Sequence, residues 1–191
     1  MSTREHLHSV VTTLQPVVER VSDDHLGAPT PCTDYDVRAV ANHMLGTMGA
    51  MRGIGASEPM NPADPWGTGA DHMTEQWRDD LCRTLSEYAE AWSSPDAWEG
   101  DIMDGAMPKQ AVGDMAFAEA ILHGWDLAKG SGQDVVFDDA VVQRALEILD
   151  QIGEMGRSQG AFGPEVALPE DAPPFDKVLA QAGRDPGWSA T

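Results

Sequence analysis

Apolar residues recur at intervals of three and four along most of this sequence, and this spacing constrains the fold more than any other feature. Such intervals place side chains on one face of an α-helix. The pattern predicts helices over about 3–21, 34–52, 68–93, 108–129 and 138–153, and a short one over about 174–182. Sustained strand alternation is absent, and only 134–137 and the stretch near Ile102 are candidates for short extended pieces. We therefore expect an all-α protein with four or five helices in a bundle.

Proline, glycine and capping residues refine these boundaries. Pro16 lies inside the first helical pattern, and because proline lacks a backbone N–H and crowds the preceding turn, we expect a kink or a break near 12–16. Thr33 or Asp34 is expected to cap the second helix. The glycines and prolines of 53–70 predict a long loop before the third helix. Loops of this length often carry function.

The charge of the chain excludes two classes of partner. Among its 191 residues 32 are acidic and 12 are basic, which gives a formal net charge of -20. Binding to nucleic acid or to anionic lipid depends on Lys and Arg residues that neutralise phosphates. We therefore expect neither nucleic acid nor a membrane surface as a partner.

Apolar runs and cysteines indicate the compartment. No run of 18 apolar residues occurs, and residues 1–7 contain no apolar signal core. Cys32 and Cys82 are too few for a disulfide scaffold and too far apart for a paired-thiol metal site. We expect a soluble, cytoplasmic protein with free thiols. Cys32 has no neighbouring histidine in the sequence to activate it as a nucleophile.

The segment 117–128 places ionisable residues within an apolar helix face. At about 100° per residue, His123 lies at about 40° and Asp126 at about -20° from Glu119, in the middle of the apolar stripe. A buried carboxylate or imidazole is costly unless it is paired or binds a metal. Because Glu119 and His123 are four residues apart, both side chains can point at one ion.

A third ligand must come from another helix, and His43 is the candidate because it lies in the middle of the second predicted helix. The other histidines lie in the first helix, in a turn or at the start of the third helix: His6, His8, His25 and His72. Small residues flank His43 one turn away and leave room for a pocket: Ala39, Thr47 and Ala50. A His/Glu/His set with an open position suits zinc, with nickel or manganese as alternatives.

Ordinary structural roles remain open for the same residues. Glu119 and His123 could form a satisfied ion pair in a wet groove, or could both face water if the helix is rotated. His43 could be a satisfied core or surface histidine. The methionines of the second helix are expected to pack in the core rather than around a cofactor.

Two separated motifs resemble a known family. The first runs Thr30-Pro-Cys-Thr-Asp-Tyr-Asp-Val-Arg38 and continues to Asn42-His43, and the second is Glu119-Ala-Ile-Leu-His123-Gly-Trp-Asp126-Leu-Ala128. In this order they resemble the mycothiol-dependent maleylpyruvate isomerase N-terminal family, a branch of the DinB-like metal-binding four-helix bundles. The tail, which includes Gly183-Arg-Asp-Pro186, is similar to an actinobacterial subgroup whose members mostly lack an assigned reaction.

The resemblance implies a set of site residues. The metal ligands of the family fall on His43, Glu119 and His123. Asp126 matches an aspartate beside the metal, which makes it the candidate catalytic residue for proton handling or for orienting a ligand. Mycothiol is implied as the thiol cofactor, with its sulfur as a thiolate at the open metal position.

The resemblance also implies a domain organisation. A DinB-like four-helix bundle with the metal site is expected over 1–156, and a short C-terminal helical extension that packs on the bundle is expected over 157–191. Only about 60 residues follow the fourth helix, which leaves no room for the further C-terminal domain of the isomerase. Maleylpyruvate isomerisation itself is therefore not expected.

The function expected is thiol transfer, addition or isomerisation of a small electrophile at a divalent metal, with mycothiol as the thiol. The expected partners are thus a small-molecule thiol and an electrophilic substrate, and a homodimer is left open. A non-catalytic metal-binding or ligand-sensing bundle is the alternative, followed by a purely structural helical protein.

Overall fold

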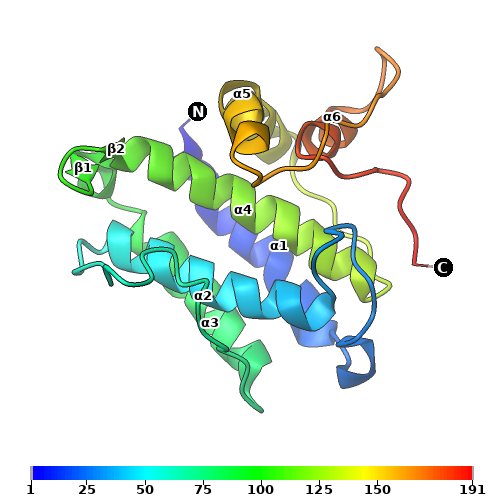
Figure 1. Cartoon of the computed structure of the whole chain (residues 1–191), viewed down its shortest axis with the longest axis horizontal. Coiled ribbons are helices and arrows are strands. Elements are labelled where there is room, and N and C mark those ends of the chain that lie inside the picture. Colours follow the sequence, from blue (N-terminus) through cyan, green and yellow to red (C-terminus); the bar gives the residue numbers. More distant parts are fainter. Residues whose placement is uncertain (1, 191) are drawn as a thin grey trace.

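The computed structural model describes residues 2–190 and shows an almost entirely helical protein (Figure 1). The helices are α1 (Leu7–Arg20), α2 (Val37–Gly55), α3 (Trp77–Ala91), α4 (Lys109–Gly130), α5 (Asp139–Ser158) and α6 (Pro174–Gln181). Single 3-10 turns cover Thr3–His6, Asp23–His25 and Pro95–Trp98, and β1 (Asp101–Ile102) pairs antiparallel with β2 (Met107–Pro108). The prediction of an all-α fold is confirmed.

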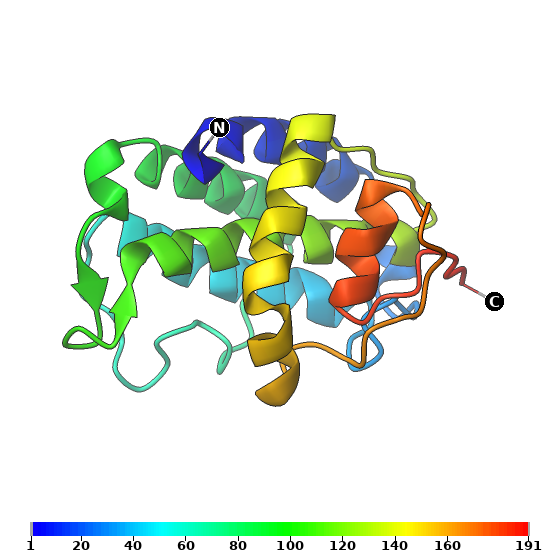
Figure 2. The ribbon, with the colours of Figure 1, turned by 90° about the horizontal axis from the view of Figure 1, so that it is seen from above.

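Helices α1 to α4 form a bundle. α2 contacts α3 and α4, and α1 contacts the same two helices, so that each helix has two neighbours. α5 crosses α4 on the side opposite α2, and α6 packs beside α5 (Figures 1 and 2). The architecture is therefore a four-helix bundle with a short helical extension at the C-terminal end. Whether the chain divides into units at 156/157 stays a prediction.

α4 is the central helix and is buried around most of its circumference. It contacts α1 and α2 in the bundle and α5 outside it, which explains why apolar and small residues surround it. α1 packs tightly against α4 at Gly124, where a Cβ atom would lie 2.3 Å from Leu14 Cδ2. Only glycine fits at that position without displacing α1.

Two predicted helix starts are wrong. α3 begins at Trp77 rather than near residue 68, and α2 begins at Val37 with Asp36, not Thr33 or Asp34, as its N-cap. Asp36 caps α2 because its Oδ1 accepts from the amide of Ala39 at 2.7 Å. The late start of α3 has a similar local cause, since Asp64 side-chain oxygens accept from the amides of residues 68 and 69 at 2.9 Å and hold that segment as a loop.

Pro16 does not break the first helix. α1 is helical from Leu7 to Arg20 with Pro16 inside it. Buried Leu14, Val17 and Val18 flank the proline and pack in the core, which offsets the lost backbone hydrogen bond.

One of the two candidate extended segments forms a strand. The stretch near Ile102 is a strand, as expected, whereas 134–137 is irregular. Within residues 2–190, every helix is too short or too polar to cross a membrane.

Candidate metal centre

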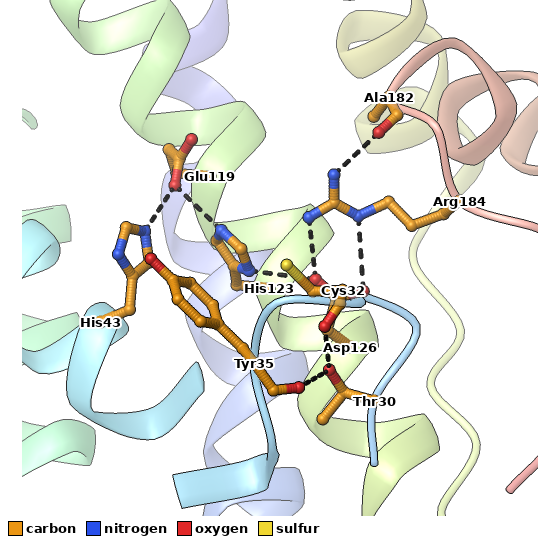
Figure 3. A network of polar contacts seen from close by, with 9 residues as sticks. All are labelled: Thr30, Cys32, Tyr35, His43, Glu119, His123, Asp126, Ala182 and Arg184. Carbon is orange, nitrogen blue, oxygen red and sulfur yellow. Dashed lines mark hydrogen bonds and ion pairs between the residues drawn. The ribbon is translucent and has the colours of Figure 1, made fainter. Parts of the chain in front are cut away.

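Three side chains from two helices converge where α2 packs on α4. His43 Nε2 lies 3.1 Å from Glu119 Oε2, and His123 Nε2 lies 3.3 Å from the same oxygen (Figure 3). One ligand atom from each residue lies within 4.8 Å of the other two, close enough for the three side chains to bind one metal ion. The structure thus brings together all three residues selected from the sequence.

The helical positions explain this convergence. Glu119 and His123 are one turn apart on the same face of α4, and His43 faces them from α2. The side chains of His43, Glu119 and His123 are 16%, 24% and 9% exposed, so the cluster lies at an edge of the bundle that solvent reaches.

The cluster strongly perturbs the protonation of its members. Burial opposes ionisation of Glu119, but hydrogen bonds from His123 and His43 outweigh it and hold the pKa of this carboxyl well below its usual range. Burial also disfavours charge on His123, yet hydrogen bonds to Asp126 and Glu119 raise its pKa to about 9. Glu119 is thus an anion at neutral pH, as a metal ligand must be.

Asp126 binds the opposite side of the His123 ring. Its Oδ2 lies 3.0 Å from His123 Nδ1, and its side chain is 0% exposed. Burial raises the pKa of this carboxyl, but His123 and the charge of Arg184 outweigh burial and lower it. An ionised Asp126 that accepts from Nδ1–H leaves the Nε2 lone pair of a neutral imidazole directed at the cluster. The chemistry of the donor set therefore fits a divalent metal.

Arg184 anchors Asp126 from the segment after α6. Its Nη2 donates to Asp126 Oδ2 at 2.9 Å, its Nε lies 3.4 Å from Oδ1, and its Nη1 donates to the carbonyl of Ala182 at 2.9 Å (Figure 3). A buried carboxylate needs such a partner. Both oxygens of Asp126 are occupied, which favours the orienting role expected for this residue over proton handling. Sequence reasoning missed Arg184 because no spacing links it to residue 126.

The turn before α2 adds two further side chains. Thr30 Oγ1 donates to the carbonyls of Tyr35 at 2.7 Å and Cys32 at 3.1 Å, which shapes this turn. The Tyr35 ring centroid lies 5.4 Å from that of His43 and 6.3 Å from that of His123. Sequence reasoning did not place Tyr35 at the site, and the motif that contains it was the available signal.

Cys32 lies on the Asp126 side of His123. Its sulfur, a His123 nitrogen and an Asp126 oxygen lie within 4.8 Å of one another. Burial, followed by the charge of Asp126, raises the pKa of the Cys32 thiol. The thiol is therefore protonated at neutral pH and is a poor nucleophile.

The other histidines lie outside these clusters. Among residues 2–190, the potential metal-binding groups are His43/Glu119/His123 and Cys32/His123/Asp126. His72, expected at the start of a helix, lies in the loop before α3, where its Nε2 is 3.1 Å from the carbonyl of Gly67.

Fold and site together define a class of protein: a helical bundle with two histidines and a glutamate clustered between two packed helices. Residues 7–128 match the family described as the mycothiol maleylpyruvate isomerase N-terminal domain. The chain belongs to this family, as the sequence motifs indicated.

Solved structures agree at the level of the fold. A crystal structure of the mycothiol-dependent maleylpyruvate isomerase superposes with a TM-score of 0.58 at 16% identity, over 89% of this chain and 77% of that one. A histidine-to-alanine mutant of that enzyme gives a TM-score of 0.54 at 18% identity over the same shares. The protein therefore has the DinB-like fold of this isomerase.

Sequence relatives come from Mycobacterium tuberculosis. An uncharacterised protein of strain H37Rv is 26% identical over 172 residues, which cover 88% of this chain and 90% of the relative. The same figures hold for an uncharacterised protein of strain CDC 1551.

Proposed function

We propose that this protein is a divalent-metal enzyme that joins a small-molecule thiol, mycothiol, to a small electrophile, or isomerises that electrophile through the thiol. The observation that carries the proposal is the convergence of His43, Glu119 and His123 at a solvent-reached edge of the bundle. Membership of the mycothiol maleylpyruvate isomerase N-terminal family supports the choice of thiol.

The donor set selects the class of metal. Two imidazole nitrogens and one carboxylate oxygen suit zinc, with nickel and manganese as alternatives. A bound divalent cation supplies a Lewis acid that lowers the pKa of a thiol or water beside it. Three protein ligands leave a position for that thiol, which is typical of catalytic rather than structural sites.

The residues around the ligands orient the imidazole of His123. Asp126 accepts a hydrogen bond from His123 Nδ1–H, so that a metal which displaces the Nε2 proton finds that nitrogen directed at the cluster. Arg184 holds Asp126 in place through two contacts, and Tyr35 covers the two imidazoles on one side. These groups orient the ligands, and the thiol and the electrophile meet at the exposed edge.

Metal analysis and thiol binding test the proposal together. Purified protein incubated with zinc should hold about one ion per chain, and the His123→Ala variant should hold none. His8→Ala is the matched control, because His8 is exposed on α1, away from the cluster, and this variant should bind zinc as the parent does. Calorimetric titration should then show mycothiol binding to the zinc-loaded parent only.

Activity separates the enzyme from a non-catalytic metal-binding or ligand-sensing bundle. The zinc-loaded parent should form a mycothiol conjugate of N-ethylmaleimide faster than buffer does, and His123→Ala should not. A rate in His123→Ala that exceeds the rate in buffer as much as the parent's does would refute the proposal. Metal binding with neither thiol binding nor turnover would leave the non-catalytic function.

A further inference from the structure

An apolar pocket lies directly beside the proposed metal centre. It is bounded by α4, the C-terminal half of α5 and the chain that follows α5, and Glu119 forms part of its wall. Figure 3 shows the second carboxylate oxygen of Glu119 directed away from the two imidazoles. Glu119 therefore belongs both to the ligand cluster and to the wall of the pocket, which makes the two sites neighbours.

The lining of the pocket is almost entirely apolar. The apolar side chains are Met115, Ala118, Ile152, Met155, Ala161 and Phe162. The cavity measures about 70 Å³, and because one water-sized group needs roughly 15 Å³, it accepts a short alkyl group or part of a ring. Met155 is 48% exposed and forms an apolar rim at the entrance.

Local backbone structure builds the outer wall. The amide of Ala161 donates to the carbonyl of Gly156 at 2.9 Å, which folds the chain back onto α5. A Cβ atom at Gly156 would lie 2.4 Å from Phe162 Cδ2, so the absence of a side chain there lets the ring lie against the helix. The pocket is thus a preformed feature of the packing.

The charges around the pocket disfavour an anion. Its polar lining consists of Glu119 and the side chain of Gln159, and within residues 2–190 no Lys or Arg contributes to it. Arg157, close by in sequence, donates to the carbonyl of Gln181 at 2.8 Å and lies 3.9 Å from Glu165. Recognition of a carboxylate substrate normally uses a free guanidinium or ammonium group, and repulsion from Glu119 opposes it further.

We infer that this pocket binds the apolar portion of a neutral electrophilic substrate, and that the protein selects against carboxylate-bearing electrophiles. The inference rests on the proposed function in assigning the pocket to that substrate. A thiol that carries many hydroxyl groups is excluded from the pocket, because the lining offers it few hydrogen-bonding partners. The thiol therefore occupies the exposed edge beside His43, and the electrophile lies on the Glu119 side.

Methyl NMR on methionine-labelled, zinc-loaded protein tests the inference without relying on turnover. Met115 and Met155 line the pocket, whereas Met103, 42% exposed in the β1–β2 hairpin, does not. N-ethylsuccinimide is the neutral, unreactive probe, and N-(2-carboxyethyl)succinimide is the matched anion. The neutral probe should shift the methyl signals of Met115 and Met155, leave Met103 unchanged, and bind at least about tenfold more tightly than the anion.

Charge substitution at the rim provides the second arm. Met155→Lys should reduce or reverse the preference for the neutral probe, and Met103→Lys, the control with similar exposure, should leave it unchanged. Equal or tighter binding of the carboxylate by the parent would overturn the inference. So would an absence of shifts at Met115 and Met155 with both probes, or an equal effect of the two lysine substitutions.

The proposed function and this inference fail in different ways. If the protein does not accelerate mycothiol conjugation above the rate in buffer but the neutral probe still binds at Met115 and Met155, the reaction is wrong and the neutral-ligand pocket remains. If conjugates form equally fast from N-ethylmaleimide and its N-(2-carboxyethyl) analogue, the reaction remains and the substrate selection is wrong.

Discussion

Removal of the Arg184 side chain should lower the stability of the protein, because it leaves the buried Asp126 carboxylate without its cationic partner. Asp126 is 0% exposed and Arg184 is 7% exposed at the side chain, with 2.9 Å between Nη2 and Oδ2. Loss of one partner from such a buried pair typically costs about 3–5 kcal/mol, because the other charge stays buried without compensation. Because His123 remains a partner of Asp126, we expect Arg184→Met to lower the free energy of unfolding by about 3 kcal/mol, near the lower end of this range. For a chain of this size that corresponds to a fall in Tm of about 10 °C.

Chemical denaturation of metal-free protein measures this effect, and an exposed ion pair provides the control. Arg38 and Asp71 lie 2.8 Å apart with side chains 45% and 62% exposed, so Arg38→Met should cost less than about 1 kcal/mol. The double variant Asp126→Asn/Arg184→Met should lose less stability than the sum of the single variants, because the interaction is lost only once. A loss in Arg184→Met no larger than that in Arg38→Met, or strict additivity, would refute the reasoning.

Three further predictions concern metal binding, thiol reactivity and helix packing. The pKa of His123 is raised to about 9, so zinc must displace a proton from this imidazole at neutral pH. The zinc affinity, measured by competition with a chelator, should therefore rise about tenfold for each pH unit between pH 7 and pH 9. An affinity that does not change with pH would contradict this prediction. Burial raises the pKa of the Cys82 thiol from 9.0 to about 11. Because only the thiolate reacts, iodoacetamide at pH 8 should alkylate Cys82 about 100-fold more slowly in the folded protein than in the denatured chain. Mass spectrometry measures both rates. Gly124→Val should lower the free energy of unfolding by about 3 kcal/mol through its clash with Leu14. Gly49→Val, also in a helix but with no atom within 4 Å of the added Cβ, is the control and should cost less; an equal loss in both variants would contradict the clash.

Helical spacing was sufficient to predict the bundle, because buried faces repeat with the period of the helix. The same spacing could not locate the start of α3. The amides of Thr68 and Gly69 donate to the side chain of Asp64, which keeps this segment out of the helix. These hydrogen bonds depend on the path of the loop in space, and the spacing of apolar residues does not reveal that path. In the same way, apolar packing carries α1 through Pro16, and that packing is a property of the assembled core.

The candidate ligands were predictable for a physical reason. Glu119 and His123 occupy an apolar helix face where an uncompensated charge would be costly, so the sequence itself indicated a missing partner. Arg184 is the counterion of the buried Asp126 carboxylate. It comes from the short segment after α6, so no helical spacing relates it to the residues of α4. A sequence reveals that a buried charge needs a counterion more readily than it reveals which residue supplies it.

The candidate metal ligands and most of the apolar pocket come from different parts of the chain. His43, Glu119 and His123 all lie within 7–128, the part that matches the family. Most of the apolar pocket wall and the counterion of Asp126 come from the chain beyond it, namely α5, the segment after α5 and the segment after α6. Changes in these later elements can therefore alter which electrophile fits without disturbing the three ligands. Under the proposed function, family members that share the three ligands but differ after α4 would therefore share the metal and thiol chemistry and differ in substrate.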